Sequence, residues 1–315
     1  MKEGVIFLQK EIWHFLCQKG NARMRGLICD LMSHSEVYTD ISKETILDDE
    51  DLLQAYNDNG NRFSFNFNET KGKYIDDTSI VPLCSIYLVN NDNLFCVGKA
   101  CLHGIFVFNA DLLSKDPKFF EKKEVYIKQD RCYNLGWHDQ FFSTILKKHE
   151  CNSLILFDKY ICKVGNISAM NPNLNILFSL ILPETLSDIP FQISIISEFD
   201  ISNGNKIYKE IQECIKKNRP KLNVQITLYQ NKSDIHDRVL ITNTYMLKSG
   251  AGFAIFKENG KPSNDTNLEY YPYKREEYYR RIEAACRISQ KAFANENFRN
   301  YWGAKENRLF DLVSN

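Results

Sequence analysis

The segment VQITLYQNKSDIHDRVLITNTYMLKSGAGF, from Val224 to Phe253, decides the fold of the C-terminal half of this chain. It contains two runs rich in β-branched and other large apolar residues, 224–229 and 238–242, separated by a mostly polar stretch. Runs of four to eight β-branched and aromatic residues between polar residues are typical of strands. The segment therefore predicts two strands, with His236 and Arg238 where the second strand begins.

Upstream of this segment, strand-like and helix-like patterns alternate. The expected elements are strands at 154–157, 191–197, 224–229, 238–242 and 254–256, and helices at 172–182 and 204–218. Such alternation predicts a sheet with helical crossovers, and ligands of such sheets bind beyond the strand ends. We therefore predict an α/β domain with a mixed sheet over residues 151–315, ending in a basic, tyrosine-rich helical segment.

The first 150 residues show a different order of patterns. Apolar spacing predicts helices at 5–18 and 22–32, and alternation predicts strands at 63–67, 84–89, 94–100, 105–108 and 124–128. Residues 90–93 (NNDN) favour a hairpin turn. The acidic run 48–51 points in several directions on a regular backbone, so we interpret it as a turn or helix N-terminus and not as a cation site. Residues 1–150 therefore predict an α+β domain with an antiparallel sheet.

Composition limits the function classes. Lys+Arg and Asp+Glu both number 40, so a nucleic-acid surface must be local. The ten cysteines lack zinc-site spacing, and the set Cys84, Cys96, Cys101 and His103 is better explained by buried thiols in strands; we expect no metal and no cofactor. Without an export signal or a long apolar run, we expect a cytoplasmic protein.

One group of residues has the composition and spacing of a known catalytic motif. His236 is followed by Arg238 at +2, Asn243 at +7 and Gly250 at +14. This spacing resembles the phospholipase D superfamily signature H-x-K-x4-D-x6-G-S-x-N. In that family the lysine holds phosphate oxygens, and two histidines from two motif copies act as nucleophile and general acid. The resemblance implies His236 as the catalytic residue if the chain is active, and a phosphate site that contains His236, Arg238, Asn243, Lys248, Ser249 and Gly250.

The departures from the signature bear on catalysis. Arg238 replaces the lysine and still suits a phosphate, because its planar fork donates several hydrogen bonds. Asn243 replaces the aspartate and supplies no negative charge. The motif occurs once, so hydrolysis of the family type requires a homodimer that brings two copies of His236 together. The H-D-R variant is also similar to the C-terminal module of certain MIT-domain proteins, which is regarded as lipid-binding.

These residues favour a module that recognises a phosphodiester, nucleic acid before lipid, with weak or no catalysis. The alternatives are a metal-independent dimeric phosphodiesterase or nuclease that uses His236, and a module that binds anionic phospholipid. A subunit of a bacterial antiviral defence assembly is suggested by analogy alone. An ion-pair and hydrogen-bond cluster without a ligand also explains His236, Asp237 and Arg238.

Overall fold

The computed structural model divides the chain into two compact units, Met1–Glu121 and Lys122–Asn315. The described residues are 5–33, 35–59, 63–67, 86–90, 106–115, 122–130, 151–162, 167–184, 189–231, 238–243, 245–257, 259, 261–272, 276–294 and 300–313. The division falls about 30 residues before the boundary predicted at 150, because strand β6 (Lys123–Ile127) pairs with β12 (Thr266–Pro272) of the second unit.

The described strands of the first unit form a parallel sheet. They are β1 (Val5–Leu8), β2 (Glu36–Thr39), β3 (Phe65–Phe67), β4 (Ile86–Leu88) and β5 (Phe106–Phe108), in the order β3-β2-β1-β4-β5. All four pairings are parallel, so the predicted antiparallel sheet is wrong for these strands, and the unit is α/β. The predicted hairpin partner at 94–100 lies outside the described residues.

The helices of this unit are α1 (Lys10–Cys17), α2 (Ala22–Ser33), α3 (Lys43–Asp48), α4 (Glu50–Asn59) and α7 (Ala110–Lys115). The helix predicted from residue 5 begins at Lys10 instead, because Val5–Leu8 is a buried apolar run of the kind that parallel strands require. Asp49 Oδ1 accepts the Leu52 N–H at 3.1 Å at the start of α4. The interpretation of the acidic run as a helix N-terminus is thereby confirmed for Asp49.

The second unit contains a mixed sheet, as the sequence predicts. Its strands are β6, β7 (Ser153–Phe157), β8 (Phe191–Ser197), β9 (Val224–Gln230), β10 (Val239–Thr242), β11 (Tyr245–Ser249), β12 and β13 (Tyr301–Gly303). The strand order is β13-β9-β8-β7-β10-β11-β12-β6. β7, β8 and β9 are parallel, and the other pairs are antiparallel. Instead of a strand at 254–256 there is one bridge, between Phe256 and Pro262.

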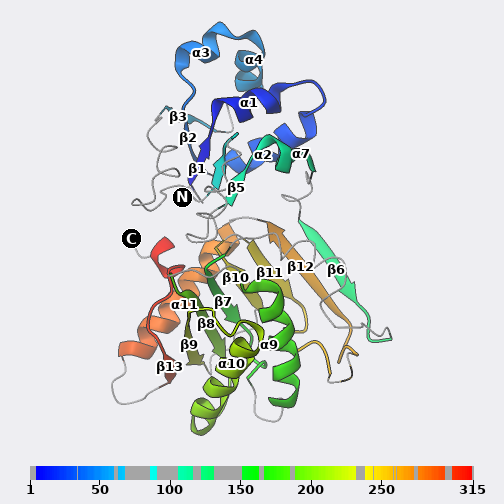
Figure 1. Ribbon diagram of the computed structural model, residues 1–315, viewed down its shortest axis with the longest axis vertical. Helices are drawn as coiled ribbons and strands as arrows, with labels where there is room; N and C mark the ends of the chain where they lie inside the picture. Colours follow the sequence, from blue (N-terminus) through cyan, green and yellow to red (C-terminus); the bar gives the residue numbers. More distant parts are fainter. Residues whose placement is uncertain are drawn as a thin grey trace. The chain divides into compact units, whose positions relative to one another are not determined.

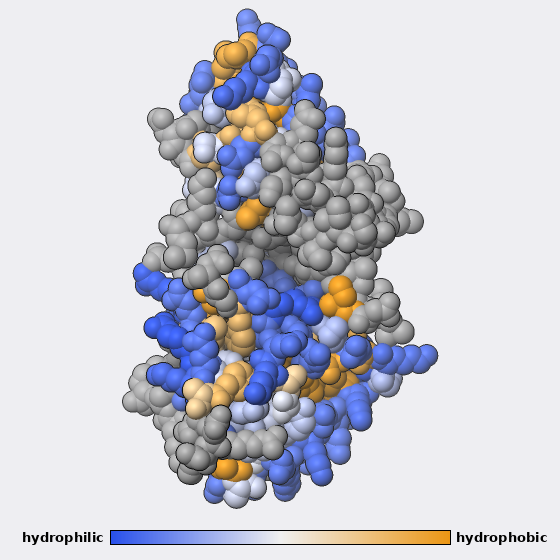
Figure 2. Space-filling view, turned by 90° about the vertical axis from the view of Figure 1, so that its left-hand side faces the viewer, coloured by the Kyte–Doolittle hydropathy of each residue, from blue (hydrophilic) through white to orange (hydrophobic). Residues whose placement is uncertain are grey.

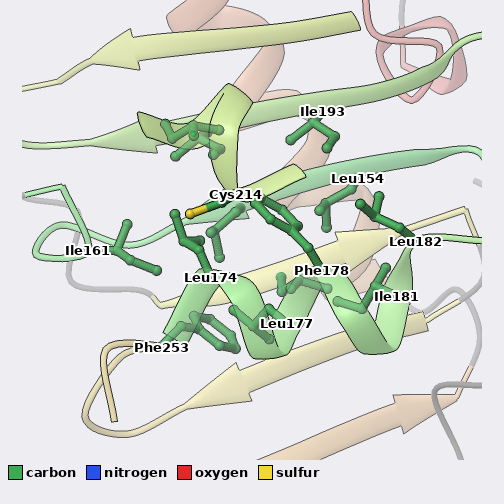
Figure 3. Packing of buried hydrophobic residues seen from close by; sticks show 14 of the residues in the cluster. Leu154, Ile161, Leu174, Leu177, Phe178, Ile181, Leu182, Ile193, Cys214 and Phe253 are labelled. Carbon is green, nitrogen blue, oxygen red and sulfur yellow. The ribbon is translucent and has the colours of Figure 1, made fainter. Parts of the chain in front are cut away.

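Helices cover both faces of this sheet (Figure 1). Helices α9 (Ile167–Ile181) and α10 (Gly204–Asn218) lie on one face, and α11 (Glu276–Ala294) lies on the other. Side chains alternate accordingly: Leu156 of β7 packs toward α9 and α10, and Phe157 packs toward α11. Figure 3 shows Leu174 and Phe178 of α9 within the first of these two cores. Because both faces of the sheet are buried, the polar residues that follow the strands lie at the ends of the strands.

Candidate functional site: the carboxyl edge of the mixed sheet

Five strand ends meet at one edge of the sheet, which we call the carboxyl edge. It comprises the residues that follow β7, β8, β9 and β11, together with Arg238, which precedes β10. Backbone hydrogen bonds tie these segments together: Asn231 N–H donates to Ser197 O at 2.9 Å, and Glu198 N–H donates to Lys159 O at 3.0 Å. This is the side of a parallel sheet where ligands bind.

Arg238 is half-buried at this edge. Its Nη1 donates to Gly250 O, and its guanidinium carbon lies 5.3 Å from the centroid of the Tyr160 ring. Its Nε is buried and has no hydrogen-bond partner among the described residues. No carboxylate among the described residues lies within 4 Å of the guanidinium. Arg238 is therefore held in place, and among the described residues much of its donor capacity is unused.

Asp158 lies beside Arg238 and is fully buried. Its Oδ2 accepts the Phe253 N–H at 2.6 Å, and its Oδ1 accepts the Tyr160 N–H at 2.9 Å. Burial raises the pKa of this carboxyl, whereas the backbone N–H donors and the charge of Arg238 act in the opposite direction. With both oxygens already accepting hydrogen bonds, Asp158 has a fixed position.

Gly252 separates the two charged side chains. A Cβ atom at this position would lie 2.8 Å from Asp158 Oδ2 and 3.2 Å from Arg238 Cδ. Gly252 also has φ +93°, a left-handed conformation that side chains other than glycine disfavour. The close approach and the backbone conformation both require glycine here.

The turn that follows β11 uses its own N–H groups. Those of Ser249, Gly250, Ala251 and Phe253 donate to Arg238 O, Asn267 O, Thr266 Oγ1 and Asp158 Oδ2. The Ser249 hydroxyl donates to Gly252 O. The turn therefore positions Arg238 and Asp158, but these four N–H groups are not available to a ligand, in contrast to the predicted roles of Ser249 and Gly250.

Two predicted phosphate-binding residues lie away from Arg238. Asn243 follows β10, about 16 Å along the strand from Arg238. Its Oδ1 accepts the N–H groups of Asn152 and Ser153, both at 2.9 Å, at the start of β7. Lys248 faces α11, where its Nζ lies 3.5 Å from Glu277 Oε1. His236 lies outside the described residues.

Three residues of the edge did not enter the predicted site: Asp158, Lys159 and Tyr160. The sequence could have indicated them, because these three residues directly follow the buried apolar run 154–157, where a parallel strand ends. Lys159 Nζ lies 3.5 Å from Glu198 Oε2 and 5.8 Å from the Tyr160 ring centroid. Tyr160 thus has a cation from each of two segments within 6 Å of its ring centre.

The described residues contain no group of three His, Cys, Asp or Glu side chains suited to a metal ion. The predicted thiols Cys84, Cys96 and Cys101, with His103, lie outside them. No helix in the described part of the chain has the length and apolar character to cross a bilayer.

Comparisons with known proteins give little support for any family. No family model matches the chain, and no curated protein matches it. Among solved structures, the crystal structure of phosphatidylserine synthase from Haemophilus influenzae Rd KW20 aligns with a TM-score of 0.28 and 9% sequence identity. The alignment covers 61% of this chain and 41% of that one. A likeness at this level establishes neither a shared fold nor a shared function.

Proposed function

We propose that the second unit is a degenerate phospholipase D-like domain that binds a phosphodiester at the carboxyl edge, with weak or no hydrolysis. One observation carries the proposal: among the described residues, Arg238 has no carboxylate within 4 Å and its Nε has no hydrogen-bond partner. A guanidinium in this state is suited to an oxyanion, because its planar fork donates parallel hydrogen bonds to two oxygens. The spacing from His236 to Gly250 supports the same assignment.

We propose nucleic acid as the source of the phosphodiester. The Tyr160 ring lies among the cations of Arg238 and Lys159, and an aromatic ring among basic groups suits a nucleic-acid strand, whose bases stack and whose phosphates are anionic. A lipid surface calls for exposed apolar anchors. Tyr126 is the one large hydrophobic residue described as exposed in this unit, and on the face seen in Figure 2 apolar residues occur in separate groups between hydrophilic ones.

Weak or absent hydrolysis is part of the proposal for two reasons. Asn243 has its carbonyl oxygen committed to the start of β7, so it contributes nothing to the chemistry beside Arg238. The single copy of the motif leaves one His236 per chain, and hydrolysis of the family type would need a second chain. No residue supports a role in a defence assembly, and the proposal does not depend on one.

Fluorescence anisotropy with labelled single-stranded DNA and RNA tests the proposal. We expect Arg238→Ala to weaken binding at least tenfold and Arg238→Lys to weaken it less, since lysine keeps the charge but loses the fork. Arg287→Ala is the matched control, because Arg287 is exposed on α11 and pairs only with Glu283 of the same helix among the described residues.

Each result separates the alternatives. Unchanged affinity of Arg238→Ala for DNA, RNA and anionic liposomes, together with a lower melting temperature, would assign Arg238 a purely structural role and remove the proposal. Loss of liposome binding alone would favour a phospholipid ligand. Cleavage that resists EDTA and disappears in His236→Ala would establish the hydrolase instead.

A further inference from the structure

Asp158 places a carboxyl group in a fixed position next to the proposed anion site. It is fully buried, and backbone N–H groups hold both of its oxygens. Gly252 brings it close to Arg238: the Cβ position of residue 252 lies 2.8 Å from Asp158 Oδ2 and 3.2 Å from Arg238 Cδ. Nevertheless, no nitrogen of Arg238 lies within 4 Å of a described carboxylate oxygen, so the two groups do not form a direct ion pair.

This arrangement differs from an ordinary salt bridge because the carboxylate does not occupy the hydrogen-bond donors of the arginine. In a direct pair, the carboxylate occupies the donors of the arginine, and an incoming anion must displace it. Here the carboxylate oxygens are occupied by the Phe253 and Tyr160 N–H groups instead. Among the described residues no carboxylate occupies the donors of Arg238, and an ionised Asp158 would offset the charge of Arg238 at short range.

We propose that Asp158 sets the charge of the ligand: it restricts the site to monoanions, and so selects an internal phosphodiester over a terminal phosphate. This inference rests on the proposed function. A phosphodiester carries one negative charge, which Arg238 matches. A phosphomonoester carries close to two at pH 8, because its second pKa is near 6. The second charge meets the field of Asp158 in a partly buried site, where screening by salt is weak.

The size of the preference follows from the geometry. Two like charges a few ångströms apart at a partly buried site repel one another enough to change affinity about tenfold, even with a high effective dielectric constant. The ligand that fits is a diester within a chain, such as the backbone of a nucleic-acid strand away from its phosphorylated end.

Two small ligands of matched size test this inference. Methyl 4-nitrophenyl phosphate is a monoanionic diester, and 4-nitrophenyl phosphate is the corresponding dianionic monoester at pH 8. Dissociation constants from NMR titration should show the wild-type protein binding the diester about tenfold more tightly. In Asp158→Asn, which removes the charge and nearly keeps the shape, the ratio should fall close to one.

Asp200→Asn is the matched control. Asp200 is an exposed carboxylate that follows β8 at the same edge, so its removal should change the ratio by less than about twofold. Equal binding of both esters to the wild-type protein would overturn the inference even if Asp158→Asn fails to fold. So would a folded Asp158→Asn that keeps the wild-type ratio.

The two proposals fail differently. Suppose that Arg238→Ala loses diester binding and that Asp158→Asn binds both esters as the wild-type protein does. This result would support the proposed function and exclude the role of Asp158. Absence of binding of either ester to the wild-type protein would remove both.

Discussion

Replacing Gly252 with alanine should destabilise the second unit by about 3 kcal/mol. Part of this cost is the left-handed backbone, φ +93°, which an alanine adopts at a cost of about 1–2 kcal/mol. The remainder is steric, because the added methyl group would lie 2.8 Å from Asp158 Oδ2. Overpacking of a fixed interior typically costs about 1–3 kcal/mol. Asp158 cannot move away cheaply, since its hydrogen bond from the Phe253 N–H is 2.6 Å long.

Gly250→Ala is the control for this experiment. Gly250 belongs to the same turn, but a Cβ there would have its nearest neighbour at 3.7 Å, an ordinary van der Waals contact. We expect a change within about 0.5 kcal/mol. The two substitutions add the same methyl group two residues apart, so their difference isolates the conformation and close packing of Gly252.

Hydrogen exchange followed by mass spectrometry is the appropriate assay, because the chain has two units that need not unfold together. Peptides from β7 and β10 report on the second unit, and peptides from β1 and β2 serve as an internal reference. A loss of 3 kcal/mol accelerates exchange of the most protected amides roughly a hundredfold. Equal effects of the two variants, or a loss below about 1 kcal/mol for Gly252→Ala, would refute the packing argument.

Further predictions concern polar and thiol groups of the second unit. Asn243→Asp should keep the free energy of unfolding within about 0.5 kcal/mol, because a carboxylate accepts the same two N–H groups, whereas Asn243→Ala should lose about 1–3 kcal/mol in urea titrations. Asn307→Ala should lower that free energy by about 2–4 kcal/mol in the same assay, because the side chain is buried and makes four hydrogen bonds, to Ser153, Leu154, Ser194 and Leu309. Burial raises the pKa of Cys162 from 9.0 to about 12, so the protonated thiol stabilises the fold fully below pH 9, and this contribution is lost progressively between pH 9 and about 12. Urea titrations from pH 8 to 11 should show a shallower decline for Cys162→Ala than for the wild-type protein, by up to about 1.4 kcal/mol per pH unit. At pH 8 iodoacetamide should label the partly exposed Cys17 well before Cys162 in peptide mass spectrometry.

Local sequence patterns predicted the bounds of those elements whose structure depends on residues close together in the chain. The strand predicted at 191–197 and the helix predicted at 204–218 have those same bounds in the structure. The first alternates the apolar residues Phe191, Ile193 and Ile195 with Gln192 and Ser194, and the second repeats its apolar residues at helical spacing, so both signals are local.

The pairing of strands was less predictable, because it depends on residues far apart in the chain. Val5 and Leu8 have the spacing of a helix that continues to Ile12, yet β1 lies between β2 and β4. Tyr270 and Tyr271 are close in sequence to other tyrosines and to basic residues near the C-terminus, but they belong to β12, inside the sheet. In both cases contacts between distant segments override the local pattern.

The structure brings together some of the predicted site residues and separates others. The position of Arg238 follows from its place before a strand, and the carboxyl edge follows from the α/β order. The role of Asp158 depends on Phe253, which is 95 residues away and donates a hydrogen bond to it. Asn243 and Lys248 match the motif by spacing alone, whereas the structure turns them toward the start of β7 and toward α11.

The short strand β10 has a consequence for how this site can change in evolution. Arg238 and Asn243 are attached at its two ends to opposite ends of β7, the first near Asp158 and the second to Asn152 and Ser153. Because side chains alternate along a strand, inserting or deleting one residue in β10 would turn Arg238 to the α11 side or break the contact of Asn243. Substitutions can alter the anion site one side chain at a time, but the length of this strand is constrained at both ends.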